Sequence, residues 1–159
     1  MPIKNYTTKL NVNEIVGRIM GLLGARGARQ INIRYDSQGV PDGIQFILMI
    51  DSVPIPFRLP CNVIGVEKAI RKQDKHFRAP RTQQHFQSVA WAIVRDWVEA
   101  QLALVEAEQA SLAQVFLPYC VISPDNNMDE AITMYDRFLE QVARQKRLGA
   151  SVTDVVGVN

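Results

Sequence analysis

The sequence has few of the residues that usually carry metal-binding or nucleophilic chemistry. It contains two histidines, His76 and His85, and two cysteines, Cys61 and Cys120. The histidines have no cysteine or carboxylate at ligand spacing, which makes them a poor metal site. Neither cysteine has a histidine nearby in sequence, and no Gly-x-Ser-x-Gly elbow or glycine-rich phosphate loop is present. These absences predict a protein with no metal, no cofactor and no catalytic residues, and therefore not an enzyme.

Long apolar runs are also missing. No segment approaches the roughly 18 apolar residues that span a bilayer, and the opening MPIKNYTTKL lacks the apolar core of a secretory signal. We therefore expect no membrane partner and a cytoplasmic location, in which both cysteines stay reduced. The net charge of +2 is too small to indicate a nucleic-acid binder by itself. With 159 residues, 47% of them apolar, the chain suits one globular domain.

One polar segment opens like a calcium-binding loop. Asp125, Asn127 and Asp129 place side-chain oxygen atoms at the first, third and fifth positions of such a loop. The sixth position is Glu130, where the loop requires glycine. Asn127 followed three residues later by Glu130 also fits the start of a helix, so we predict a helix cap here and no metal.

The longest helical pattern runs from Thr82 to about Gln109 and contains neither proline nor glycine. Its apolar residues form two adjacent stripes with helical spacing: Phe86, Val89, Ile93, Trp97, Ala100 and Leu104 in the first, and Trp91, Val94, Val98, Leu102 and Val105 in the second. A helix that is apolar around most of its circumference is buried on more than one side. We therefore expect it to be the central helix of the fold. Arg95 and Glu99 are four residues apart, a spacing that predicts an ion pair on its narrow polar side.

The N-terminal half predicts one helix and three strands. Asn11 and Glu14 have the spacing of a capping box at the start of a helix, which Gly24 or Gly27 would end. Strands are predicted over residues 31–35, 44–50 and 53–59, the second apolar on both faces and therefore central. The third strand contains two prolines, at 54 and 56, which lack the amide hydrogen that a paired strand needs. We therefore predict that it is an edge strand.

The C-terminal half predicts only helices. Asn62 would cap a helix that reaches about Asp74, and Ser111 with Gln114 would open a short turn. The last helix would start at the cap formed by Asn127 and end at Gly149. Its predicted buried stripe consists of Ile132, Tyr135, Leu139 and Val142. The fold class is therefore α+β, with an N-terminal helix, a three-stranded antiparallel sheet and a helical half built around one long buried helix.

This organisation predicts one domain over residues 1–149. Residues 1–75 form its sheet half and residues 82–149 its helical half. Residues 150–159 are predicted to be a flexible tail.

Basic residues concentrate between the second helix and the long helix. Six of them occur within 14 positions, with only Asp74 in opposition: Lys68, Arg71, Lys72, Lys75, Arg78 and Arg81. Lysine and arginine side chains neutralise phosphates, and Phe77 could stack on an unpaired base. This stretch predicts a contact with DNA or RNA. The alternative is a solvated, positively charged face without a binding role.

Four segments resemble a known family: PIKNYTTKL at the start, PFRLP at 56–60, VAWAIVRDWVEAQLALVE at 89–106 and VFLPY at 115–119. They are similar to small uncharacterised proteins carried by bacteriophages, prophages and other mobile elements of bacteria. The resemblance covers roughly residues 1–120. It implies a setting inside a bacterial host cell, and it implies no catalytic or ligand-binding residues.

Two functions fit these observations. The first is a non-enzymatic accessory protein of a mobile element that binds nucleic acid through residues 68–81. The second is a protein-binding module, either an inhibitor of a host enzyme or defence system or a self-assembling component. Its candidate contacts are Trp91, Trp97, Phe116 and Tyr119. The two tryptophans lie about 240° apart around the helix, so one is expected against the sheet and the other against the last helix or a partner chain. Self-association is expected because the long helix has more apolar surface than a small sheet and short helices can cover.

Overall fold

The fold is α+β, as the sequence predicted, and the computed structural model describes residues 3–73, 80–122 and 131–156, with the side chains of the last stretch described to Gly149. The first part contains α1 (Val12–Ala25), three strands, β1 (Arg29–Tyr35), β2 (Pro41–Ile50) and β3 (Val53–Pro60), and α2 (Val63–Lys72). The second contains α3 (Gln83–Glu106), α4 (Leu112–Phe116), the 3-10 turn η1 (Leu117–Tyr119) and the short strands β4 (Val121–Ile122) and β5 (Ile132–Thr133). The last element is α5 (Met134–Val156).

The helix starts follow from local sequence. Asn11 caps α1 through a complete capping box with Glu14, and Ser111 forms the same motif with Gln114 at α4. Asn62 and Thr82 cap α2 and α3 by accepting a hydrogen bond from a backbone amide of the first turn. After α1 the chain turns at Gly27, whose φ of +82° favours glycine. The caps predicted at Asn11, Asn62 and Ser111 are confirmed.

The three-stranded sheet is antiparallel with the order β1-β2-β3. The two-residue connection between β2 and β3 has positive φ at both Asp51 (48°) and Ser52 (67°), the geometry that suits a tight hairpin. β3 is an edge strand, as its prolines predicted; Pro54 pairs with Met49 and Pro56 with Ile47. β2 is central but buried mainly on one face, where three side chains are almost fully covered: Ile44, Phe46 and Leu48.

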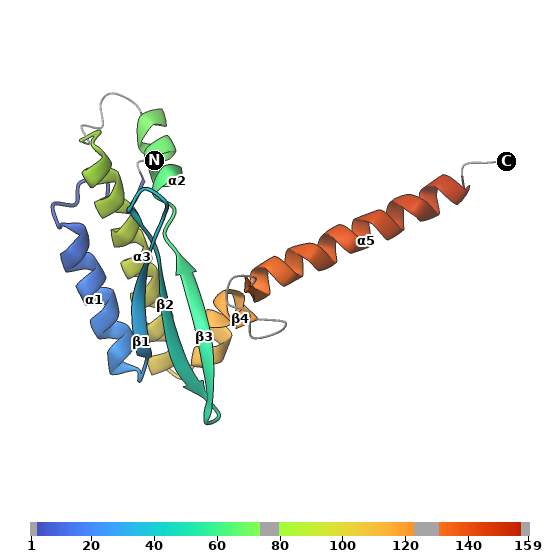
Figure 1. Cartoon of the computed structure of the whole chain (residues 1–159), viewed down its shortest axis with the longest axis horizontal. Coiled ribbons are helices and arrows are strands. Elements are labelled where there is room, and N and C mark those ends of the chain that lie inside the picture. Colours follow the sequence, from blue (N-terminus) through green and yellow to red (C-terminus); the bar gives the residue numbers. More distant parts are fainter. Residues whose placement is uncertain (1–2, 74–79, 123–130, 157–159) are drawn as a thin grey trace.

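Helices α1 and α3 lie side by side against one face of the sheet (Figure 1). The hydrophobic core between them extends from Ile15 in α1 through β2, β3, α2 and α3 to Phe116 in α4. The N-terminal half of α3 is surrounded on nearly every side, so that even Ser88 is buried, whereas Leu104 near its C-terminus is 38% exposed. α3 is therefore the central helix that its apolar stripes predicted.

One ion pair differs from its sequence prediction. Arg95 donates two hydrogen bonds to the neighbouring Asp96, at 2.9 Å from Nε and 2.5 Å from a terminal nitrogen, instead of pairing with Glu99. Asp96 also accepts hydrogen bonds from Lys4 and Asn5. The N-terminal segment brings two further donors to Asp96, which the i,i+4 rule for an isolated helix does not take into account.

The bounds and the burial of the last helix differ from the prediction. α5 begins at Met134 and continues through Val156, beyond the end predicted at Gly149. It extends away from the rest of the molecule (Figure 1), and the described residues 134–149 contribute nothing to the hydrophobic core. Tyr135 and Leu139, predicted to be buried, are exposed, while Ile132 lies in β5 and Val142 is half-buried. The predicted cap residues Asn127 and Glu130 lie outside the described residues.

Candidate protein-interaction surface

Helix α5 presents an apolar stripe to solvent. Tyr135, Phe138 and Leu139 are 54%, 59% and 46% exposed. With 100° per residue, these three and the half-buried Val142 fall within an arc of about 100° on one face. The opposite face carries Glu140 and Arg144. The helix is therefore amphipathic, but the side chains that such a pattern normally buries face solvent.

The first turn of α5 is fixed to the rest of the fold by hydrogen bonds. The backbone amide of Met134 donates to the Cys120 carbonyl at 2.9 Å. Both the amide and the hydroxyl of Thr133 donate to Asp136 Oδ2 at 2.8 Å. These bonds from Thr133 hold the pKa of the Asp136 carboxyl below its usual value. The Met134 bond therefore ties the base of α5 to Cys120, whereas the bonds between Thr133 and Asp136 cap the helix locally.

Arg58 of β3 connects the three-stranded sheet to the base of α5. A terminal nitrogen of its guanidinium donates to the Ala131 carbonyl at 3.4 Å. Burial, and then the charge of Arg34, lower the pKa of this guanidinium, and Asp136 opposes that change. Arg58 therefore has a structural role beside the first turn of α5.

An apolar groove lies next to this junction. It has a volume of about 170 Å³ and is lined by Leu59 and Pro60 of β3, Ile93, Val94 and Trp97 of α3, and Tyr119 of η1. Trp97 is one of its lining residues and packs edge-on against Tyr119, with ring centroids 5.3 Å apart, and against Phe116 at 5.9 Å. Trp97 and Tyr119 remain partly exposed. The groove is therefore a preformed apolar surface whose aromatic side chains are held by ring contacts.

The four side chains predicted to contact a partner separate into two groups. Trp97 and Tyr119 line the groove, where a partner can reach them. Trp91 and Phe116 are fully buried, so neither side chain is accessible in this arrangement. Phe116 packs against Phe46 and Phe57 of the sheet, with ring centroids 5.5 Å and 6.0 Å away. Trp91 and Phe116 are core residues, which corrects the expectation that they face a partner.

The basic stretch is only partly covered by the structure. Lys75, Phe77 and Arg78 lie outside the described residues. Lys68, Lys72 and Arg81 are exposed, and none of them has a salt-bridge partner in the described part of the chain.

Arg71 differs from the other described residues of this stretch. It forms an ion pair with Glu67 at 2.8 Å, and its guanidinium lies 5.4 Å from the centroid of the Phe86 ring. The hydrogen bond from Arg71 lowers the pKa of Glu67. Arg71 therefore contributes to the packing of α2 on α3, a role that the charge pattern did not indicate.

His85 and Cys61 lie in environments that indicate a structural role. His85 is buried, with Nε2 2.8 Å from the Tyr6 carbonyl. Burial, together with the charge of Asp42, raises the pKa of the Cys61 thiol to about 12. Among residues 3–73, 80–122 and 131–156, no cluster of three His, Cys, Asp or Glu side chains could hold a metal ion. His76 and the calcium-like segment 125–129 lie outside these ranges.

Sequence reasoning missed most of this surface. Leu59 was assigned to the sheet and Ile93 and Val94 to the helix stripes, and only the tertiary arrangement brings them together with Pro60 around Trp97. The stripe of α5 was visible as a 3.6-residue period. That period does not show whether the stripe is covered by its own domain, by a partner or by solvent.

Comparisons with known proteins find no match among family models, curated proteins or solved structures. The resemblance to proteins of bacteriophages and mobile elements therefore stays a prediction. None of the described helices is both long and apolar enough to cross a membrane.

Proposed function

We propose that this chain is a non-enzymatic protein-binding module and that α5 is its binding element. The observation that supports this proposal is the exposed stripe of Tyr135, Phe138 and Leu139. A buried aromatic side chain covers roughly 150–250 Å², so three half-exposed side chains present on the order of 300 Å² of apolar surface. Contiguous apolar patches of that size often mark interaction sites in soluble proteins.

The stripe has the spacing that helix-in-groove recognition uses. Such helices contact a partner through residues at positions i, i+3, i+4 and i+7. On α5 these positions are Tyr135, Phe138, Leu139 and Val142. A receptor for this helix needs an apolar groove. We expect Phe138, the most exposed of the four, to contribute most to binding.

To test this proposal, the wild-type chain and a Phe138→Glu chain are each immobilised, and the proteins that they retain are compared. Each is exposed to a bacterial lysate and, separately, to the purified wild-type protein. We expect at least one of these two sources to contain a binder that Phe138→Glu retains at least about tenfold less well, because a buried aromatic contact is replaced by a charge.

Arg144→Gln is the matched control. It lowers the charge of α5 by the same single unit but lies on the face opposite the stripe. Its binding should equal that of the wild type. The proposal is wrong if Phe138→Glu retains the same proteins as the wild type from both sources.

The setting of this module is part of the proposal. The resemblance of residues 1–120 to proteins of bacteriophages and mobile elements supports a role in the cytoplasm of a bacterial host cell. There the module would either inhibit a host enzyme or defence system or assemble with other copies of itself.

We propose nucleic-acid binding as a second candidate function. It is supported by Lys68, Lys72 and Arg81, which are exposed and have no carboxylate partner in the described residues. Titration with labelled single- and double-stranded DNA at two salt concentrations tests it. Affinity should fall steeply with salt and should fall further when these three side chains are changed to glutamine. Binding that is absent at low salt, or insensitive to both changes, removes this candidate.

A further inference from the structure

We propose that the partner of α5 is a second copy of this chain, and that each copy lays its α5 in the apolar groove of the other. This inference rests on the proposed protein-binding function and names the partner. It follows from two surfaces of one chain that complement each other: the stripe of Tyr135, Phe138, Leu139 and Val142, and the groove around Trp97.

The groove and the stripe match in size and chemistry. The groove is open to solvent on one side and has a volume of about 170 Å³ between side chains that are almost entirely apolar. Apolar cavities of about 150 Å³ are large enough to bind benzene. The volume of the groove is therefore large enough for a single phenyl ring, such as that of Phe138. Tyr135, Leu139 and Val142 would then cover its rim.

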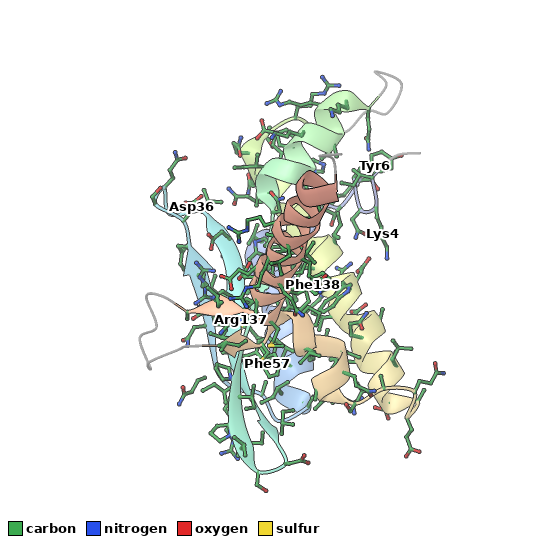
Figure 2. The ribbon with its side chains drawn as sticks, turned by 90° about the vertical axis from the view of Figure 1, so that its right-hand side faces the viewer. Lys4, Tyr6, Asp36, Phe57, Arg137 and Phe138 are labelled. Atoms are coloured by element: carbon green, nitrogen blue, oxygen red, sulfur yellow. The ribbon has the colours of Figure 1, made fainter. Side chains whose placement is uncertain are left out.

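Helix α5 runs away from the body that contains the groove, and its stripe is exposed to solvent. The base of the helix lies beside the groove, because the Met134 amide donates to Cys120 and Cys120 follows Tyr119 in the chain. From there α5 runs outward (Figure 1), and in Figure 2 it projects toward the viewer, with Arg137 and Phe138 labelled on its first turns. With a rise of 1.5 Å per residue, its 23 residues extend about 35 Å. The stripe occupies the first two turns of α5, residues 135–142, so the part that would enter a partner's groove lies within about 12 Å of its base.

The surface area that the contacts would bury supports a reciprocal exchange of α5 between two copies. One helix seated in one groove buries on the order of 600 Å² when both sides are counted, which is the range of weak or crystal-packing contacts. Two such contacts bury on the order of 1,200 Å², the lower limit of stable specific interfaces. A second copy of this chain supplies both a groove and a helix, so a two-fold pair closes on itself and leaves neither surface open.

The experiment measures the mass of the purified chain in solution by light scattering over a range of concentrations. The wild type should have twice the monomer mass of 17.9 kDa. Phe138→Glu, on the helix, should weaken association at least about tenfold. Val94→Glu, in the groove, should have the same effect. The charge-matched Arg144→Gln should associate like the wild type.

Mixing the helix variant with the groove variant tests directly whether two copies exchange α5. A pair of Phe138→Glu and Val94→Glu chains retains one intact contact, between the normal helix of the second and the normal groove of the first. The mixture should therefore form a species of twice the monomer mass, more weakly than the wild type, at concentrations at which each variant alone stays monomeric. A dimer made by two α5 helices packed against each other gives a different result, because Val94→Glu alone would still dimerise.

A second groove variant keeps the test independent of folding defects. Pro60→Glu changes an exposed residue at the rim, and circular dichroism checks that both groove variants keep their helices. The inference is overturned if the wild type is monomeric at all concentrations, or if both groove variants dimerise normally. If the wild type is monomeric but a lysate protein binds in a manner that depends on Phe138, this inference fails and the proposed protein-binding function stands.

Discussion

At the scale of single residues, the carboxylate of Asp96 joins the N-terminal segment to the central helix. It lies 2.9 Å from Lys4 Nζ, 3.0 Å from Asn5 Nδ2 and 2.9 Å from Arg95 Nε. Burial by itself would raise the pKa of Asp96, but hydrogen bonds from Lys4, Asn5 and Arg95 outweigh it and hold the pKa at about 2. The segment that precedes α1 is therefore attached to α3 through one negative charge.

We expect Asp96→Asn to lower the free energy of unfolding at pH 7 by about 1–2 kcal/mol. The amide removes the charge that Arg95, only 14% exposed, pairs with. Because the folded pKa lies below the unfolded value of about 3.9, this stabilisation is fully present above pH 4 and is lost as the pH falls toward 2. Urea unfolding of both proteins at pH 7 and at pH 3 measures it.

The difference between the two proteins should shrink at pH 3. Lys4→Gln serves as the control, because Lys4 is 69% exposed and an exposed partner contributes little. An equal difference at both pH values would show that the contribution of Asp96 does not depend on its charge.

At the scale of elements, two glycines differ in what surrounds them. Gly43 lies in β2, and a Cβ placed on it would come within 2.8 Å of the backbone carbonyl oxygen of Leu59 in the neighbouring strand. Gly17 lies in α1, and a Cβ there would meet nothing within 4 Å. Gly43 is therefore required by the close approach of β2 and β3, whereas Gly17 is only tolerated by its helix.

Alanine should act in opposite directions at these two positions. Gly43→Ala should destabilise the protein by about 1–3 kcal/mol, because backbone atoms must move to admit the methyl group. Gly17→Ala should stabilise it by about 0.5–1 kcal/mol, because alanine loses less backbone entropy in a helix. Denaturant unfolding measures both, and a Gly43→Ala protein as stable as the wild type would contradict the strand geometry.

At the scale of the whole molecule, stability and assembly are coupled if two copies exchange α5. Any partner that binds only the folded state stabilises it by mass action. We therefore expect the thermal midpoint of the wild type to rise by several degrees when the protein concentration increases a hundredfold. The midpoint of Phe138→Glu should not change with concentration.

Differential scanning calorimetry at several protein concentrations measures this coupling. The core includes none of residues 134–149, so the Phe138→Glu monomer should still unfold cooperatively. A wild-type midpoint that is independent of concentration would contradict the exchange of helices.

Much of the fold could be predicted from local sequence signals. The capping pairs of Asn11 with Glu14 and of Ser111 with Gln114 act over three residues, so they form wherever the segment is helical. The prolines of β3 predicted an edge strand without reference to the rest of the molecule, and β3 is the edge of the three-stranded sheet, with an isolated bridge from Phe57 to Cys120 on its outer side. The helical spacing of the apolar residues in α3 likewise predicted a buried helix, because that spacing is a property of the local sequence.

The interaction surface depended on tertiary structure. The groove joins β3, α3 and η1, and Leu59 and Tyr119 are 60 positions apart in the chain. Arg95 pairs with the neighbouring Asp96, on which Lys4 and Asn5 of the N-terminal segment also converge, and not with Glu99 as predicted.

The sequence by itself determined that residues 134–149 form an amphipathic helix, because the period of its apolar residues is a local property. Tertiary structure decided that the helix leaves the domain, because the hydrogen bond from Met134 to Cys120 fixes its base and residues 134–149 take no part in the core formed by α1, the sheet and α3. The spacing of apolar residues in a sequence shows which side chains form an apolar stripe. It carries no information about which surface buries that stripe.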